Sequence, residues 1–208
     1  MGLLSKESRD AFAERQANSS SGSSRYLNTK DLSEDGTRIT FLGDETNTLH
    51  GYGVWCDRKG GGKKINLRTA KKLSRTELEE RADEIGAIAP TDLQREFYAF
   101  TVWNYDEEAI QIFEFNQSGL IGPIIEFLSD DEIDGSEKEY DFKVTKNKTG
   151  PDPRFDIRYS AVSLAGKRKK NSSIDKQIDK AFNELLDTGF DISVLLDSEG
   201  DPFNPGLK

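Results

Sequence analysis

Lysine and arginine side chains gather in two blocks whose charge could bind phosphate groups. Residues 58–75 contain eight basic residues and no acidic one, and residues 143–170 contain nine basic residues against Asp152 and Asp156. The whole chain has a formal net charge of −9, so most carboxylates lie outside these blocks. This segregation predicts a basic surface on an acidic body. Solvated charge on loops remains the alternative interpretation of either block alone.

Aromatic side chains that could stack on a flat ligand are concentrated between Phe97 and Phe115, where seven of them occur. Aromatic and β-branched residues favour strands, and the polar stretch 104–108 favours a turn. We therefore predict a hairpin of two strands, about 95–104 and 109–115. Large apolar side chains would lie on both of its faces. Either both faces are covered by protein, which is the simpler interpretation, or one is a platform for a nucleobase.

Groups suited to catalysis or metal binding are scarce. His50 is the only histidine and Cys56 the only cysteine, and together they cannot supply the four ligands of a zinc site. We place His50 in a surface turn. The acidic run 130–135 resembles the start of a calcium-binding loop, but Asp141 stands where a bidentate glutamate belongs. We expect no enzyme activity, no metal and no cofactor; a metal-dependent nuclease is the less favoured alternative because paired carboxylates are plentiful.

The remaining elements follow from periodicity and capping. Alternating apolar residues predict further strands at 37–42, 52–56, 140–145 and 155–162. In the second of these, Tyr52 and Trp55 point to opposite faces. Helices are predicted at 74–86, where Ser74 and Glu77 form a capping box, from Ser118 onward, and after Ser172 or Ser173. The stretch 58–64 has the composition of a flexible basic loop. The last helix has an apolar stripe that must cover this chain or a second subunit.

The chain divides into three regions by composition. Residues 1–24 form an N-terminal arm with a Ser/Gly linker, 25–165 the folded domain, and 166–208 a basic loop, a helix and an acidic tail. No apolar run approaches the roughly 20 residues that span a bilayer, and the N-terminus lacks the apolar core of a signal peptide. A single cysteine excludes an intrachain disulfide and is typical of a reducing compartment. We expect a soluble cytoplasmic protein, in the host cytoplasm if the chain is viral.

About five strands, few helices and a basic loop leaving a tryptophan-bearing strand fit a mainly β fold, the five-stranded Greek-key barrel called the OB-fold, with inserted and C-terminal helices. Residues 25–163 also resemble the OB-fold single-stranded DNA-binding proteins of tailed bacteriophages. The pieces that carry the resemblance are RYLNTKDLSEDGTRITFLGD (25–44), GYGVW (51–55), VWNYDEEAIQIFEF (102–115), IIEFL (124–128) and YDFKVTKNKTGPDPRFDIRY (140–159). The helix at 74–86 departs from the family as an insertion. The chain also ends in Pro-Gly-Leu-Lys where such proteins often carry a long acidic tail, for which 187–201 is the candidate substitute.

The resemblance implies a non-catalytic protein that coats and protects single-stranded DNA during replication, recombination and repair. It also implies replication or recombination proteins as partners of the acidic C-terminal segment. We further expect the carboxylates of this segment to compete with DNA phosphates for the basic residues. The sequence leaves the oligomeric state open, a homo-oligomer included. The main rival from another class is a protein-interaction or scaffolding module that uses the acidic face.

The candidate site combines stacking with backbone charge. The stacking candidates, for each of which a place in the core is the alternative, are Tyr52, Trp55 and Trp103. The candidates for phosphate contacts are Arg58, Lys59, Lys63, Lys64, Arg68, Lys143, Lys146, Lys148 and Arg158.

Overall fold

The computed structural model describes residues 25–130, 132–133, 139–152, 156–197 and 201–204. Within these residues the protein is mainly β, as predicted, with one sheet of nine strands and three α-helices. The predicted N-terminal arm, 1–24, lies outside the described residues. The strands are β1 Tyr26–Asn28, β2 Thr37–Phe41, β3 Thr48–Arg58, β4 Ile65–Thr69, β5 Ala87–Ile88, β6 Arg95–Asn104, β7 Ala109–Phe115, β8 Asp141–Lys148 and β9 Ile157–Ser163. The helices are α2 Arg75–Glu84, α3 Ser118–Leu128 and α4 Ser173–Asp187, with short 3-10 helices η1 Thr29–Asp31, η2 Glu45–Asn47 and η4 Ile192–Leu196.

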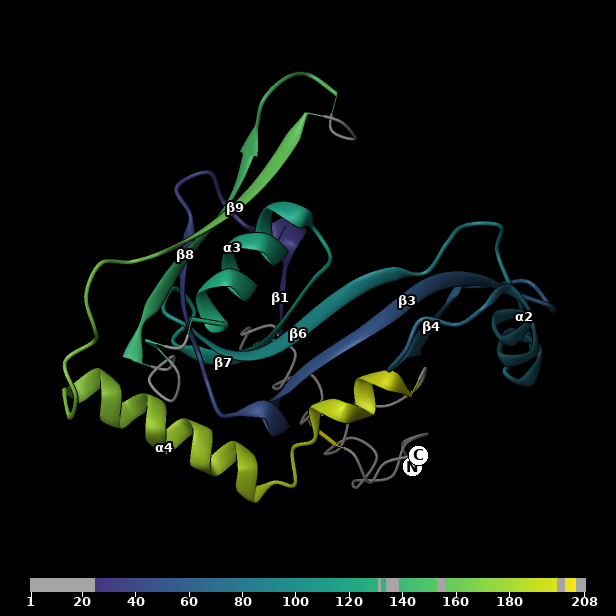
Figure 1. Ribbon diagram of the computed structural model, residues 1–208. Helices are drawn as coiled ribbons and strands as arrows, with labels where there is room; N and C mark the ends of the chain where they lie inside the picture. The colour runs from purple at the N-terminus through teal and green to yellow at the C-terminus, as the bar shows by residue number, and fades with distance from the viewer. Residues whose placement is uncertain (1–24, 131, 134–138, 153–155, 198–200, 205–208) are drawn as a thin grey trace, which may run out of the picture.

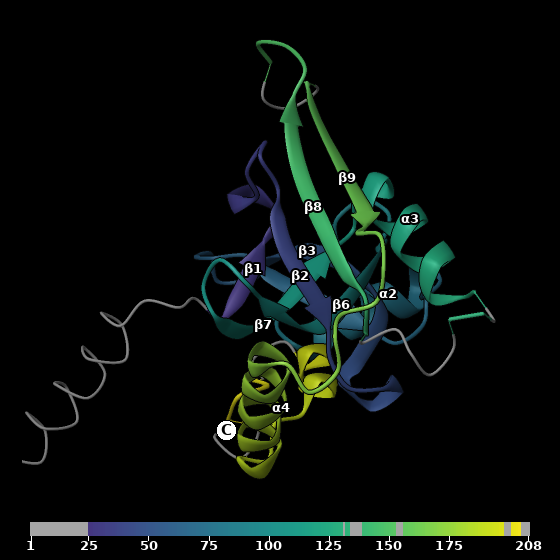
Figure 2. The ribbon, with the colours of Figure 1, turned by 90° about the vertical axis from the view of Figure 1, so that its left-hand side faces the viewer.

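The predicted hairpin of β6 and β7 is confirmed and lies at the centre of the sheet. The first half of β6 pairs with β3 and its second half pairs with β2. The sheet therefore divides into two arms that leave the centre in different directions (Figure 1). One arm is β3, β4 and β5 with α2, and the other is the β8–β9 hairpin, which pairs with β2. Figure 2 shows this hairpin projecting from the body, with α4 at the opposite end.

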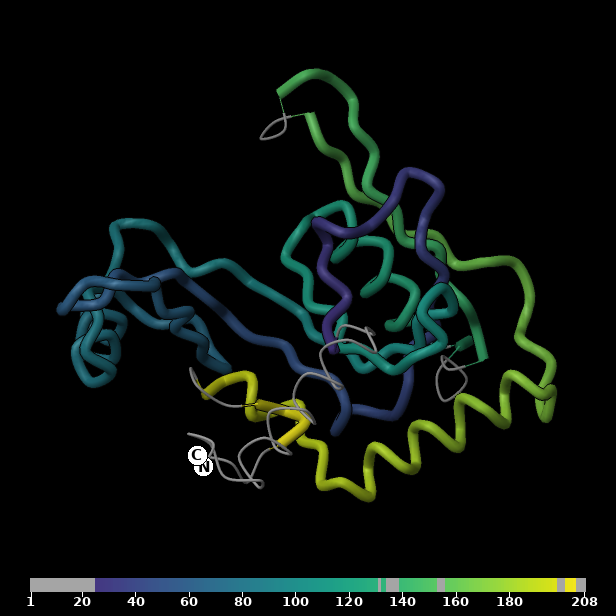
Figure 3. The backbone as a smooth tube through the Cα atoms, turned by 180° about the vertical axis from the view of Figure 1, so that it is seen from behind, coloured from purple at the N-terminus to yellow at the C-terminus, as the bar shows by residue number. Residues whose placement is uncertain are grey.

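Both faces of the central hairpin are covered, so the simpler interpretation of its aromatic residues is confirmed for most of its length. On one face, Phe100 and Phe115 pack against α3 through Leu120 and Ile124. On the other face, α4 and η4 follow one another along the sheet (Figure 3). There Trp103 packs with Ile178 of α4, and Phe97, Ala99 and Ile112 pack with Ile192 and Leu195 of η4. The apolar stripe of the last helix and the apolar part of the tail therefore cover this chain's own sheet.

The closed five-stranded barrel is not confirmed, because the sheet of the described residues stays open. Its end strands pair on one side only, β1 with β7 and β9 with β8. Helix α3 packs against β9 instead of a further strand. Gly119 allows this approach, since a Cβ atom there would lie 2.1 Å from the carbonyl oxygen of Tyr159.

Several element boundaries differ from the prediction. The strand expected at 52–56 runs over Thr48–Arg58, so His50 lies in a strand and the surface turn predicted for it is wrong. Gly51 interrupts the apolar alternation, so the sequence pattern does not reveal this part of the strand. A glycine is required at this position because the ring of Phe97 lies against it. The loop predicted at 58–64 contains the end of β3 and a turn that leads into β4, a strand that was not predicted.

The helices agree more closely with the prediction than the strands do. The capping box of Ser74 and Glu77 is present at α2, and Ser172 caps α4. For α3 the N-cap is Gln117, with no side-chain cap bond, and Ser118 is the first helical residue. Strand β8 extends to Lys148, beyond the end predicted at 145, so Lys146 and Lys148 belong to this strand. Among the described residues, no helix has the length and apolar character needed to cross a membrane.

Candidate nucleic-acid interface

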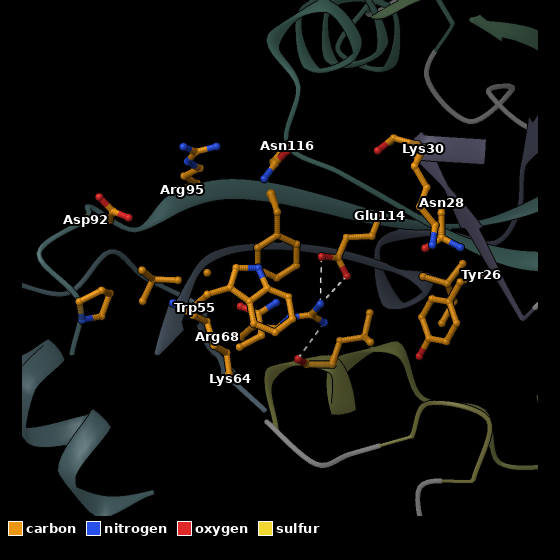
Figure 4. Close-up of a pocket in the computed structure, with 18 of the residues that line it drawn as sticks. Tyr26, Asn28, Lys30, Trp55, Lys64, Arg68, Asp92, Arg95, Glu114 and Asn116 are labelled. Atoms are coloured by element: carbon orange, nitrogen blue, oxygen red, sulfur yellow. Dashed lines mark hydrogen bonds and ion pairs between the residues drawn. The ribbon is translucent and has the colours of Figure 1, made fainter. Parts of the chain in front are cut away.

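A groove of about 830 Å³ lies where the β3–β4 arm meets the body of the sheet. Strand register determines which side chains form it. Gly53 is opposite both Arg68 of β4 and Arg95 of β6, and Trp55 is opposite Asn66. Because opposed residues share a face, these side chains project from one face of the sheet. Figure 4 shows the groove continuing past Glu114 of β7 to Tyr26, Asn28 and Lys30, with η4 along its lower edge.

Trp55 is the aromatic side chain of the groove that is open to solvent, with 60% of its surface exposed. Its strand neighbours Val54 and Cys56 point the other way and pack against Leu78 and Ala82 of α2. One face of the β3–β4 arm is therefore anchored in a small core of its own. The opposite face presents the indole ring, which could stack on a planar ligand.

Arg68 lies in the middle of the groove and is engaged within the protein. Its Nη2 donates to both carboxylate oxygens of Glu114, at 2.9 and 2.7 Å, and its Nη1 donates to the carbonyl of Leu195 at 3.3 Å. The guanidinium also lies 5.2 Å from the centre of the Phe97 ring. The Asn66 amide is best oriented with its oxygen accepting from Arg68 Nε at 3.0 Å. Only 16% of the Arg68 side chain is exposed, so its main role is to join β4, β7 and η4.

The other two stacking candidates lie away from the groove. Trp103 is 1% exposed beneath α4, so a base could reach its ring only if that core opened. We therefore remove Trp103 from the candidate interface. Tyr52 is half-buried on the face opposite Trp55, with its ring centre 5.5 Å from that of His50. His50 in turn stacks on Tyr98 at 4.6 Å, and its Nε2 lies 2.8 Å from a carboxylate oxygen of Glu96.

The first basic block surrounds the end of the β3–β4 arm, and only part of it reaches the groove. Lys64 lines the groove and also pairs with Asp57 at 3.2 Å. Lys59 pairs with Asp83 of α2, and Arg58 Nε donates to the carbonyl of Lys63 at 3.2 Å. Exposed ion pairs of this kind contribute little free energy. Their cations can therefore exchange a carboxylate for a phosphate at small cost.

The second basic block belongs to the other arm. Lys143, Lys146 and Lys148 lie on β8 and Arg158 on β9, and they are absent from the described lining of the groove. Lys146 Nζ donates to the carbonyl of Lys30. The two arms extend in different directions (Figure 1), so among the described hydrogen bonds and ion pairs of these four residues only that of Lys146 reaches a residue that lines the groove, Lys30.

Several lining residues were not predicted. Arg95 could have been found, because strand alternation places it on the same face as Phe97. Asn116 could have been found in the same way, because it follows the strand predicted at 109–115 and continues the alternation of Ile112 and Glu114. Asn28 could not, since its position depends on the parallel pairing of β1 with β7, between segments far apart in the chain. Asp92, Glu114 and Asp197 bring negative charge to a groove that was predicted to be basic.

A buried ionic cluster lies outside the groove and joins the 166–170 segment to the sheet. Asp141, 5% exposed, accepts hydrogen bonds from Arg168 Nη1 at 3.2 Å, Arg38 Nε at 3.1 Å and the Tyr105 hydroxyl at 2.8 Å. Burial, and then the hydrogen bond to Asp141, raise the pKa of Tyr105 to about 12. Arg168 also donates to Asp175 of α4 at 3.0 Å. At least this residue of the basic run has a structural role.

Across the part of the chain that the structure describes, no group of three or more His, Cys, Asp or Glu side chains is arranged to hold a metal ion. Comparison of the chain with family models, curated proteins and solved structures finds no match.

Proposed function

We propose that this chain is a non-catalytic protein that binds single-stranded DNA in the groove between the β3–β4 arm and the body of the sheet. Its role would be to coat and protect the strand during replication, recombination or repair, as the resemblance of residues 25–163 implies. The observation that carries the proposal is the exposed ring of Trp55 on an anchored sheet face. An indole ring held on a fixed sheet face offers a flat apolar surface, and stacking on aromatic rings is a general means of holding unpaired bases.

The strand order supports an OB-like origin of the fold. Strands β2, β6 and β7 are adjacent in that order, and β8 returns after α3 to pair with the free side of β2. With β3, β4, α2 and β5 taken as an insertion between β2 and β6, the resulting order β7–β6–β2–β8 is that of a Greek key. Helix α3, between the third and fourth of these strands, covers one face of the sheet. The finer proposal is therefore an OB-type barrel left open between β7 and β9, with β1 paired along β7.

The two tryptophans allow a direct test, because one is exposed and the other buried. Titration with oligo-dT should quench Trp55 fluorescence, and the Trp55→Phe variant, in which only Trp103 emits, should show little quenching. Trp55→Ala should weaken binding by about 1–3 kcal/mol with little change in stability. Trp103→Ala is the contrasting variant and should lower stability by about 3–5 kcal/mol. Unchanged affinity in Trp55→Ala would refute the groove as the binding site.

A protein partner is the second candidate. Leu93 also lines the groove and is 77% exposed, and an apolar side chain gains more from a protein surface than from a sugar–phosphate backbone. Leu93→Ser separates the two candidates. It should leave oligonucleotide affinity unchanged if DNA is the ligand, whereas a protein ligand would lose affinity with this variant and would not compete with oligo-dT.

A further inference from the structure

The groove is poorly suited to holding a strand by its phosphates alone. Among its described lining residues, four are cationic and three are carboxylates. The cations are Lys30, Lys64, Arg68 and Arg95, and the carboxylates are Asp92, Glu114 and Asp197. Arg68, the central cation, already donates to Glu114 and Leu195. Phosphate binding draws its free energy from cations that replace counterions, so a nearly balanced groove must draw affinity from other contacts.

The groove has a row of side chains suited to the edges of bases. Asn28 of β1 is opposite Glu114 of β7 in the parallel register, and Asn116 follows directly after β7. Both amides are exposed, and each carries two donors and an acceptor. Figure 4 shows the three residues around the part of the groove that lies between Trp55 and Tyr26. Amide side chains in such a row can bond to bases, whereas a phosphate would use only their donors.

Glu114 adds a charged acceptor in the middle of this row. The bond from Arg68 holds the carboxylate in position, and 29% of the side chain remains exposed to the groove. A carboxylate repels phosphate, but it accepts a hydrogen bond from the exocyclic amino group of a base such as cytosine. Thymine has no such amino group, and its one donor, the ring N3–H, lies between two carbonyl oxygens that a carboxylate would repel. The centre of the groove therefore distinguishes bases by their donors.

We propose that the groove recognises an unpaired strand through its bases, with a preference for bases that carry an exocyclic amino group over thymine. This inference rests on the proposed function and specifies its ligand. Trp55 provides the stacking surface, and Asn28, Asn116 and Glu114 bond to the base edges beyond it. The phosphates remain directed outward, toward the lysines at the end of the β3–β4 arm.

The test compares oligo-dC with oligo-dT of about 12 nucleotides, a length within the range that such folds cover. The full chain should bind oligo-dC about ten-fold more tightly, the discrimination expected of one good base-edge contact. The double variant Asn28→Ala/Asn116→Ala should reduce this ratio to about two-fold, because no amide then holds the base edge against the Glu114 carboxylate, and the slope of affinity against salt should stay unchanged. Asn147→Ala, the same change on β8 outside the groove, is the matched control and should keep the full ratio.

Every other outcome of this test contradicts a stated part of the proposal. Equal binding of the two oligonucleotides, or tighter binding of oligo-dT, would overturn base recognition while leaving single-strand binding intact. A preference that survives in the double variant would overturn its assignment to Asn28 and Asn116. Failure to bind either oligonucleotide would overturn the proposed function and this inference with it.

Discussion

Lys63, Lys64 and Arg68 belong to the same basic block of the sequence, yet their surroundings give them different roles. Lys63 and Lys64 lie at the exposed end of the β3–β4 arm, whereas Arg68 is bonded to Glu114 and to the backbone of η4. Side chains that are exposed to solvent, such as those of the two lysines, can contact phosphates. A guanidinium whose donors are engaged within the protein contributes mainly to the fold.

Neutralising the two lysines should therefore change binding and not stability. In Lys63→Gln/Lys64→Gln the slope of log K against log salt should become less steep by about 0.7 for each phosphate that is no longer bound. Arg68→Gln should instead lower the free energy of unfolding by about 1–3 kcal/mol, because Glu114 is left without its charged partner. Oligonucleotide titrations at several salt concentrations and urea denaturation measure the two effects. An Arg68→Gln protein with normal stability and a flatter salt slope would return Arg68 to the residues that bind phosphate.

Tyr105 links stability to pH in the alkaline range. Its pKa is raised from an ordinary value of 10.0 to about 12, so the folded state holds this proton more tightly than the unfolded chain. The stabilisation is complete below the unfolded pKa, decreases as pH rises from about 10, and is lost as pH passes the folded pKa near 12. Melting temperatures of the wild type should fall over this interval, and those of Tyr105→Phe should fall less. Parallel curves for the two proteins would contradict the role of Tyr105.

Among the elements, helix α3 contributes to stability through its close packing against β9. At Gly119 the carbonyl oxygen of Tyr159 leaves no room for a side chain. Gly122, in the same helix, has open space around it. Substituting each glycine with alanine therefore distinguishes the effect of close packing on stability from the effect of helix propensity.

Gly119→Ala should destabilise the protein by about 1–3 kcal/mol, because the new Cβ forces the helix or the strand to move. Gly122→Ala is the control and should stabilise it by up to about 1 kcal/mol, since alanine favours the helix. Urea denaturation of both variants measures the difference. If the two substitutions had the same sign, the approach of α3 to β9 would not be the cause.

At the scale of the whole molecule, the C-terminal segment is part of the sheet's cover and also borders the groove. Phe190, Ile192 and Leu195 are buried against the central hairpin, and Asp197 lines the groove. A chain ending at Gly189 would expose this face, and its stability should fall by several kcal/mol, since each buried apolar side chain contributes about 1.5–3 kcal/mol. Truncation would therefore change both the stability of the fold and the charge beside the groove, and a binding measurement on it would not separate the two effects.

A single substitution isolates the expected competition between the tail and DNA. Asp197→Asn should bind oligo-dT more tightly than the wild type at low salt and equally at high salt, where charges are screened. Asp187→Asn removes the same charge at the end of α4, outside the described lining of the groove, and should have no such effect. Equal affinities of Asp197→Asn and the wild type at low salt would show that the tail does not compete.

The sequence alone determined the elements whose signals are local. The capping box of α2 involves Ser74 and Glu77, and the hairpin of β6 and β7 depends on a short polar turn between two aromatic strands. These interactions join residues that are close together in the chain, so residue type and spacing are sufficient to predict them. Strand β4 was not predicted, and β3 was predicted too short, because glycines and lysines interrupt the apolar alternation there.

Which of the candidate residues are available to a ligand depends on contacts between distant parts of the chain. Trp55 and Trp103 are equivalent as sequence, but α4, from a distant part of the chain, buries one of them, while no described element covers the other. Arg68 is engaged by Glu114, 46 positions along the chain, and its predicted contact with phosphate stays a prediction. Burial and charge pairing depend on which distant elements meet, and that meeting is fixed by the packing of the whole chain rather than by any local pattern.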